Sequence, residues 1–268
     1  MFSPIYLVIN GASGRMGHAL IQACVANKDT ELAAGLVRST STLIGSDAGQ
    51  VAGVGQLGIL LASELADVPA HVWVDFTLPD GAMLGLEQCL EKNIPMVIGT
   101  TGFTTEQKQK IYAAGKSIPI VYAPNMSIGV NLCLNLLRTT AQTLDDDYDI
   151  EIIESHHRNK VDAPSGTALR MGEVIAAATD TSLEDRAVYS REGNIGARNK
   201  GEIGFETIRA GDIVGEHTVY FAGIGERIEI THRATSRLTF AQGAMRAAIW
   251  LQNQPPGVYD MQDVLGLT

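Results

Sequence analysis

Four side chains that can carry a positive charge lie within five residues of one another, at His156, His157, Arg158 and Lys160. The chain has a formal net charge of −10, so this basic segment indicates a local site for an anionic ligand. Histidine titrates near neutral pH, and a lysine among other cations releases its proton more readily, so both can transfer protons at pH 7. The segment therefore predicts general-acid chemistry on an anionic substrate, with a solvated basic loop as the alternative.

The residues that follow this segment predict an anion-binding turn. Ser165 or Thr167 can cap the helix that is expected to start here, which leaves free backbone N–H groups near Gly166. Helix N-termini bind carboxylates because their N–H groups and the helix dipole favour negative charge. We therefore expect a substrate carboxylate to bind between this helix start and Lys160.

A glycine-rich turn near the N-terminus predicts a dinucleotide site. Gly11, Gly14 and Gly17 follow the apolar run 5–9 and open a helical pattern. In dinucleotide folds such glycines allow a tight turn, bring backbone N–H groups close to the pyrophosphate, and let the helix touch the strand. The spacing is G-x-x-G-x-x-G rather than the commoner G-x-G-x-x-G. A βα turn without a ligand is the alternative.

The end of the next strand bears on which cofactor is used. An acidic residue there binds the ribose of NAD, whereas a basic residue accommodates the 2′-phosphate of NADP. The strand ends at Leu36-Val37-Arg38 and has no carboxylate. Arg38 therefore favours NADPH over NADH, and a solvated charge at the strand end is the alternative.

A parallel sheet is needed to position these turns. Over the first 122 residues, short apolar runs alternate with helical patterns, as in consecutive βαβ units. The expected strands are residues 5–9, 31–37, 71–76, 96–98 and 118–122, and the expected helices are 16–26, 82–91 and 105–115. Residues 39–58, rich in Ser, Thr and Gly, are expected to form a mobile loop, with one short strand within it as an open alternative.

The pattern changes after Tyr122. The expected helices are then 128–143, 168–178 and 238–251, and the expected strands are 148–154, 202–209, 216–221 and 227–231. Glycine-containing turns separate the last three strands, which is typical of antiparallel pairing. We predict an α/β protein with an N-terminal doubly wound, Rossmann-like parallel sheet over residues 1–126. An α+β domain with a mainly antiparallel or mixed sheet is expected over residues 127–237.

The composition argues against several classes of protein. An isoelectric point of about 5.0 gives no general attraction to nucleic acid or to an anionic membrane. Cys24, Cys89 and Cys133 are odd in number and lack metal-ligand spacing, so neither a disulfide framework nor a metal site is predicted. The N-terminal residues, Met1-Phe2-Ser3-Pro4, do not begin a signal peptide or a membrane span. We expect a cytoplasmic protein.

With these motifs in order, the chain resembles the dihydrodipicolinate reductase family, also called 4-hydroxy-tetrahydrodipicolinate reductases. The run H-H-x-x-K-x-D-A-P-S-G-T-A over residues 156–168 carries most of the resemblance, and residues 209–217 form a second similar block. The resemblance implies that NAD(P)H reduces 4-hydroxy-tetrahydrodipicolinate, a small dicarboxylate, to tetrahydrodipicolinate in lysine and diaminopimelate biosynthesis. It also implies a homotetramer joined through the C-terminal sheets, with a last segment, 238–268, that returns to the dinucleotide-binding domain.

The resemblance assigns roles to individual residues. His156 and Lys160 are implied as catalytic proton-transfer residues, and which of them donates the proton is left open. His157, Gly166 and Thr167 are implied as substrate-carboxylate contacts. The implied cofactor contacts are Gly11, Ala12, Ser13, Gly14, Arg15, Met16, Arg38, Gly99, Thr100, Thr101, Ala123, Pro124, Asn125 and Met126. The family often has a glutamate before the arginine that contacts the NADP phosphate, and Val37 stands there in this chain, which further favours NADPH.

Two other function classes fit the nucleotide domain alone. A semialdehyde or homoserine dehydrogenase would need a different catalytic constellation, and its acylating form would need an exposed cysteine. Cys133 lies inside a helical pattern between Leu132 and Leu134, so we expect it to be a core residue. A dinucleotide sensor without catalytic activity would leave the His/Lys cluster unexplained.

Overall fold

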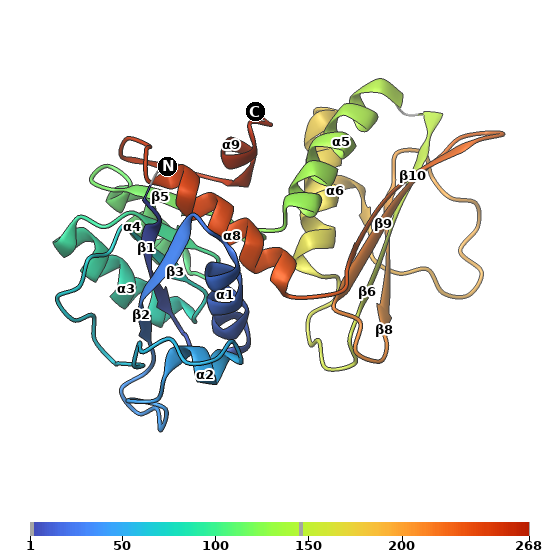
Figure 1. Ribbon diagram of the computed structural model, residues 1–268. Helices are drawn as coiled ribbons and strands as arrows, with labels where there is room; N and C mark the ends of the chain where they lie inside the picture. The colour runs from blue at the N-terminus through green and yellow to red at the C-terminus, as the bar shows by residue number, and fades with distance from the viewer. Residues whose placement is uncertain (1–2, 145–146, 268) are drawn as a thin grey trace. The chain divides into compact units, whose positions relative to one another are not determined.

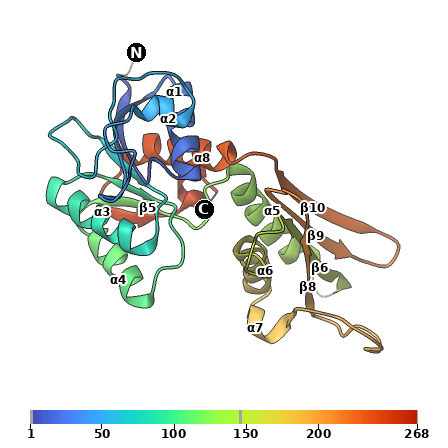
Figure 2. The ribbon, with the colours of Figure 1, turned by 90° about the horizontal axis from the view of Figure 1, so that it is seen from below.

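The computed structural model describes residues 3–144 and 147–267. The expectations on a signal peptide and on the first and last domain ranges include Met1, Phe2 and Thr268. These three residues lie outside the described residues. The chain divides into two compact units, shown in Figures 1 and 2. Unit 1 comprises Met1–Ile128 together with Arg237–Thr268, and unit 2 comprises Gly129–Ser236.

Unit 1 is built on a parallel sheet. Its described residues form six strands in the order β11-β5-β4-β3-β1-β2, and every pair is parallel. The strands are β1 (Ile5–Asn10), β2 (Thr30–Leu36), β3 (Val72–Asp75), β4 (Met96–Ile98), β5 (Pro119–Tyr122) and β11 (Gly257–Tyr259). The strand order reverses between β1 and β3, which is where doubly wound sheets bind ligands beyond the carboxyl ends of the strands. The predicted Rossmann-like sheet is confirmed.

Helices cover both faces of this sheet, as Figure 1 shows. The helices of unit 1 are α1 (Arg15–Ala26), α2 (Ala48–Ala52), α3 (Pro79–Lys92), α4 (Thr105–Ala114), α8 (Leu238–Leu251) and α9 (Met261–Leu265). Alternate strand residues pack to opposite sides: Leu7 and Ile9 belong to the core with α1 and α8, whereas Val8 packs with α3 and α4. α8, from the far end of the chain, thus completes the same layer as α1.

The loop expected over residues 39–58 contains a short helix, α2. Asp47 caps it by accepting from the backbone N–H groups of Gly49 and Gln50, at 2.9 and 3.0 Å. The same carboxylate also accepts from the N–H groups of Leu57 and Gly58, at 3.1 and 2.7 Å. One side chain therefore organises the segment that follows β2.

Unit 2 contains a mixed sheet, as predicted. Its described residues form five strands in the order β10-β9-β6-β8-β7. The strands are β6 (Asp149–His156), β7 (Ala187–Val188), β8 (Ile203–Arg209), β9 (Gly215–Ala222) and β10 (Arg227–Ala234). β6 and β7 pair with β8 in parallel, whereas β9 pairs antiparallel with β6 and β10. The helices are α5 (Ile128–Leu144), α6 (Gly166–Ala178) and α7 (Leu183–Arg186).

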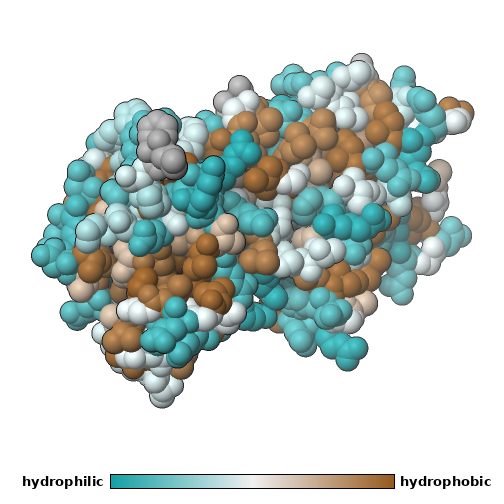
Figure 3. Space-filling view, in the orientation of Figure 1, coloured by the Kyte–Doolittle hydropathy of each residue, from teal (hydrophilic) through white to brown (hydrophobic). Residues whose placement is uncertain are grey.

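One face of this mixed sheet forms the core of unit 2. Figures 1 and 2 show α5 and α6 on the same face. Ile150 and Ile152 of β6 and Val219 and Phe221 of β9 pack beneath these helices. In the described part of the chain, the opposite face carries no helix of unit 2. Figure 3 shows apolar side chains at the surface over α5, where Leu132 is 45% exposed.

None of the described helices combines the length and apolar character needed to cross a membrane. The same residues contain no group of three or more His, Cys, Asp or Glu side chains that could hold a metal ion.

Candidate active site

The predicted proton-transfer residues lie at the carboxyl end of β6, between β8 and β9. β6 ends at His156 and α6 begins at Gly166, so the connecting loop carries the rest of the predicted motif. Nδ1 of His156 lies 2.6 Å from Oε2 of Glu154. A Cβ at Gly215 would lie 3.0 Å from Nε2 of His156, so the glycine keeps that side of the ring clear.

Glu154 is a carboxylate that is 1% exposed and surrounded by donors. Nη1 and Nη2 of Arg209, on the neighbouring β8, donate to it at 2.8 and 2.7 Å. Burial raises the pKa of Glu154, but hydrogen bonds from His156 and Arg209 outweigh burial and lower it to about 2. Glu154 is therefore an ionised acceptor at neutral pH. Nδ1 of His156 carries the hydrogen, and Nε2 remains for chemistry with a ligand.

Lys160 is held in a defined place by the loop after β6. Its Nζ lies 2.8 Å from Oδ1 of Asp162, and Nη2 of Arg209 donates to the carbonyl oxygen of Asp162 at 2.6 Å. Burial raises the pKa of Asp162, but the hydrogen bond and charge of Lys160 outweigh it and lower the pKa. The loop therefore places an ammonium group beside an ionised carboxylate and is fastened to β8 through Arg209.

The helix start is capped by Ser165 rather than by Thr167. Oγ of Ser165 accepts from the backbone N–H of Ala168 at 3.2 Å. The N–H groups of Gly166 and Thr167 belong to the first turn of α6 and point out of the helix start. Apart from the chain neighbours of Gly166 and the backbone of α6, no atom of the described residues lies within 4 Å of the position that a Cβ at Gly166 would take, so the turn is open on that side. This arrangement can bind a carboxylate.

A second histidine, His217 on β9, lies beneath this turn and is 4% exposed. Its Nε2 lies 2.9 Å from Oγ of Ser165, and its ring packs edge-on against His156 with centroids 5.2 Å apart. Burial, together with the nearby His156, lowers the pKa of His217 to about 3, so the ring is neutral at pH 7. Nδ1 of His217 has no hydrogen-bond partner among the described residues.

The neutral state of His217 predicts a loss of stability in acid. Its pKa is about 3 in the folded protein against 6.5 for the free group, so between these values the unfolded chain binds a proton that the folded chain does not. Stability should therefore fall as the pH drops from 6.5 toward 3. Between pH 7 and pH 5 this one group should cost up to about 2 kcal/mol. Urea unfolding at the two pH values should show a smaller loss for His217→Gln than for the parent, and equal losses would contradict the prediction.

In unit 1, the glycine-rich turn has the geometry that a dinucleotide needs. The N–H groups of Gly11 and Ala12 both donate to the carbonyl oxygen of Leu36 at 2.9 Å, which ties the turn to the end of β2. Gly11 has φ = 79°, a conformation that favours glycine. Gly14 stands at the N-cap of α1 and has no side chain to occupy the first N–H groups, so these remain for a phosphate.

Asp75, which is fully buried, connects the turns at the carboxyl edge of the sheet. It accepts from Nδ2 of Asn10 at 2.7 Å, from the N–H and hydroxyl of Thr77 at 3.0 and 2.8 Å, and from the hydroxyl of Thr100 at 2.7 Å. The structure thus brings together the ends of β1, β3 and β4, where the predicted cofactor turns lie.

Several predicted cofactor contacts have side chains turned into the protein. Ala12, Ala123 and Met126 belong to the hydrophobic core of unit 1. The hydroxyl of Thr100 donates a hydrogen bond to Asp75. Only their backbone groups are available to a ligand. Arg38, by contrast, is exposed just beyond β2.

All predicted cofactor residues lie in unit 1, and all predicted catalytic and substrate residues lie in unit 2. The sequence did not assign roles to Glu154, Arg209 and His217. Only Glu154 has a signal in the sequence, which is strand alternation. Glu154 follows Ile150 and Ile152 on one face of β6, so a carboxylate stands where the pattern predicts an apolar side chain.

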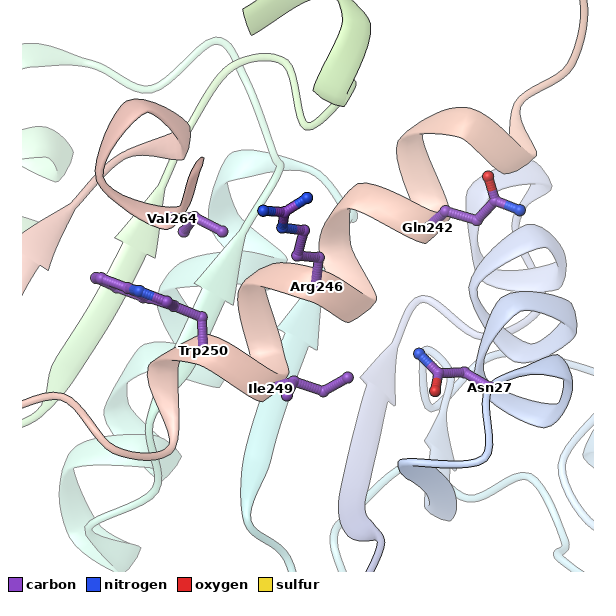
Figure 4. A pocket seen from close by; sticks show the side chains of 6 residues that line it. All are labelled: Asn27, Gln242, Arg246, Ile249, Trp250 and Val264. Carbon is purple, nitrogen blue, oxygen red and sulfur yellow. The ribbon is translucent and has the colours of Figure 1, made fainter. Parts of the chain in front are cut away.

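A surface hollow of about 430 Å³ in unit 1 is separate from these turns. Figure 4 shows the side chains that line it: Asn27, Gln242, Arg246, Ile249, Trp250 and Val264. Asn27 caps the carboxyl end of α1, whereas the glycine-rich turn opens its amino end. The hollow contains none of the predicted site residues.

Comparison with known proteins finds matches for both units of the chain. Residues 5–126 match the N-terminal domain of dihydrodipicolinate reductase, and residues 129–265 match its C-terminal domain. The chain is 57% identical to the 4-hydroxy-tetrahydrodipicolinate reductase of Hahella chejuensis over 97% of this chain and 98% of that protein. It is 55% identical to the enzyme of that name from Methylococcus capsulatus, over 97% of each chain.

The chain is also similar to a solved structure of a dihydrodipicolinate reductase. The dipicolinate-bound dihydrodipicolinate reductase of a Paenisporosarcina species matches with a TM-score of 0.76 and 25% identity, covering 97% of this chain and 98% of that one. The matches span both units of the chain and include the 156–168 motif. The chain belongs to the dihydrodipicolinate reductase family.

Proposed function

We propose that the protein reduces 4-hydroxy-tetrahydrodipicolinate to tetrahydrodipicolinate with NAD(P)H, a step of lysine and diaminopimelate biosynthesis. The loop between β6 and α6 carries this proposal, because His156, Lys160 and the open start of α6 occur together there. A dicarboxylate that must accept a proton needs cationic contacts and an acid, and this loop contains both.

The catalytic roles are divided within the loop. His156, with Nε2 left available, and Lys160 are the proton-transfer residues, while Gly166 and Thr167 bind a substrate carboxylate through the first turn of α6. His157 contributes a second contact, and its buried Nδ1 has no partner among the described residues, so the ring can turn a donor to a ligand.

The cofactor, when bound, supplies the hydride. Its pyrophosphate fits the turn Gly11–Met16, because Gly14 leaves the first N–H groups of α1 uncapped. The neighbouring contacts are Gly99–Thr101 and Ala123–Met126, at the carboxyl ends of β4 and β5. Arg38 holds the 2′-phosphate, so NADPH is the preferred cofactor and NADH the weaker one.

Arg38→Ala should reduce kcat/KM for NADPH roughly 10- to 100-fold and leave kcat/KM for NADH nearly unchanged. Lys28→Ala is the matched control, since the exposed Lys28 lies before the amino end of β2, whereas Arg38 follows its carboxyl end. A parent that strongly prefers NADH would refute this assignment. Val37→Glu is a poor test, because Val37 is 5% exposed in the core and a carboxylate there would be desolvated.

The proposed activity is tested by following NADPH absorbance with the condensation product of pyruvate and aspartate semialdehyde as substrate. We expect NADPH to be oxidised only when both pyruvate and aspartate semialdehyde have supplied the condensation product. Folded protein that binds NADPH yet never oxidises it with this substrate would refute the proposal. An acylating dehydrogenase is disfavoured, because Cys133 is buried in the core and burial raises the pKa of its thiol.

We also propose a homotetramer that joins through the sheet of unit 2. The face of this sheet opposite α5 and α6 carries half-buried polar side chains, among them Thr218 and Thr231, whose hydroxyls lie 3.1 Å apart. Another chain can cover this face, and light scattering with size exclusion should give four chains per particle. The cytoplasm is the proposed location, since the three thiols are unpaired and buried, as suits a reducing compartment.

A further inference from the structure

Glu154 is bonded through both carboxylate oxygens to groups from several elements. Oε2 accepts from Nδ1 of His156 at 2.6 Å and from Nη1 of Arg209 at 2.8 Å. Oε1 accepts from Nη2 of Arg209 at 2.7 Å, from the N–H of Ser165 at 3.1 Å and from Oγ1 of Thr207 at 3.3 Å. These donors come from β6, β8 and the start of α6, so the carboxylate joins them.

The contact with His156 controls the imidazole. An ionised carboxylate on Nδ1 fixes the tautomer and the ring orientation, and it stabilises the positive charge that develops when Nε2 takes a proton. A buried carboxylate and arginine alone would add little to stability, because desolvation offsets their attraction. Arg209 balances the buried negative charge of Glu154. His156 is the partner through which this charge acts on the reaction.

The contact with Ser165 controls the carboxylate-binding turn. The N–H of Ser165 donates to Oε1 of Glu154, while Oγ of Ser165 caps α6 and contacts Nε2 of His217. The position and direction of the first turn of α6 therefore depend on Oε1 of Glu154. The orientation of His156 depends in the same way on Oε2 of Glu154.

We propose that Glu154 is a positioning residue of the reductase, which orients His156 through Oε2 and holds the start of α6 through Oε1. This inference rests on the proposed function. Glu154 thereby sets the distance between the proton-transfer group and the bound substrate carboxylate. The charged and titratable groups around His156 are Glu154 on its own strand, Arg209 on β8, His217 on β9, and the Lys160–Asp162 pair in the loop.

Glu154→Gln tests the proposal in the full-length enzyme, because it keeps the shape and removes the charge. We expect kcat to fall roughly 10- to 100-fold with a smaller change in substrate KM. The alkaline limb of the pH–rate profile should move to lower pH, because the imidazolium loses its carboxylate. NADPH affinity should not change, since the cofactor residues lie in unit 1. Glu173→Gln, at an exposed Glu–Arg pair on α6, is the matched control and should behave as the parent.

The double variant His156→Gln/Glu154→Gln distinguishes an effect of Glu154 that acts through His156 from a general structural effect of the substitution. If Glu154 acts through His156, the double variant should be little slower than His156→Gln alone. Full additivity of the two losses, or an unmoved pH profile in Glu154→Gln, would overturn the proposal. If Glu154→Gln does not fold, Glu154→Asp keeps the charge but shortens the reach, and parent-like kcat in that variant would also overturn it. Failure of the proposed function is distinguishable, because then neither the parent nor Glu173→Gln oxidises NADPH.

Discussion

Lys160→Ala and His156→Gln should each lower kcat by on the order of 10² or more. Both remove a group that can give a proton to the reduced substrate, and neither removes a group that supports the fold core. Lys160 contacts only the side chain of Asp162 among the ion pairs of the described residues. Glutamine at 156 can still bond Glu154 but cannot titrate. Steady-state rates with saturating NADPH and substrate measure the effect.

The conservative variant Lys160→Arg shows which role the lysine has. Arginine keeps the positive charge but does not lose a proton near neutral pH. A lysine that only binds a carboxylate should be replaced by arginine with little loss in kcat, whereas a proton donor should not. Lys200→Ala, at an exposed lysine of the same unit, controls for loss of charge. Unchanged turnover in both Lys160→Ala and His156→Gln would reassign the basic segment to surface charge.

The sequence predicted the parallel sheet because its central strands are continuous apolar runs. It did not predict β11, Gly257–Tyr259, since three partly buried residues give no periodic signal. That strand exists because it pairs with β5. α2 was missed for a similar reason: its cap, Asp47, is completed by N–H donors of Leu57 and Gly58, which follow the helix.

The site was predictable where its residues are close in sequence. His156, Lys160 and the start of α6 belong to one run, so their proximity follows from spacing. Arg209 and His217 reach the same site from β8 and β9, and only strand register brings them there. His156 pairs with Arg209 in the β6–β8 ladder, and Glu154 pairs with His217 in the β6–β9 ladder. Neither ladder can be read from local pattern.

Each unit has a buried carboxylate that holds neighbouring turns together, but the two carboxylates have different hydrogen-bond partners. Asp75 and Glu154 are buried carboxylates at strand ends, and each fastens neighbouring turns by accepting several hydrogen bonds. Among the described residues, Asp75 accepts from neutral donors of Asn10, Thr77 and Thr100, whereas Glu154 also accepts from a guanidinium and an imidazole. Under the proposed function, the charged partners of Glu154 lie at the proton-transfer residue His156, whereas the neutral partners of Asp75 hold backbone turns in place.

Gly17→Ala should destabilise unit 1 by roughly 3 kcal/mol, the upper end of the usual cost of overpacking, and strongly weaken NADPH binding. A Cβ at Gly17 would collide with the carbonyl oxygen of Gly11 and would lie 2.6 Å from the carbonyl atoms of Ala12. These are backbone atoms of the glycine-rich turn, and both residues are tied to Leu36 of β2 by hydrogen bonds of 2.9 Å. No side-chain rotation can relieve the overlap, so α1 must move away from β1.

Gly14→Ala is the control that separates packing from cofactor approach. Among the described residues other than its chain neighbours, a Cβ at Gly14 would meet the carbonyl oxygen of Gly11 alone, at 3.3 Å, which a shift of a few tenths of an ångström relieves. We therefore expect Gly14→Ala to keep most of the stability in urea unfolding and to weaken NADPH binding, because its methyl group stands at the N-cap where the pyrophosphate should lie. Parent-like stability of Gly17→Ala would show that helix and strand can separate there without cost. Unaltered NADPH affinity in Gly14→Ala would move the pyrophosphate away from this turn.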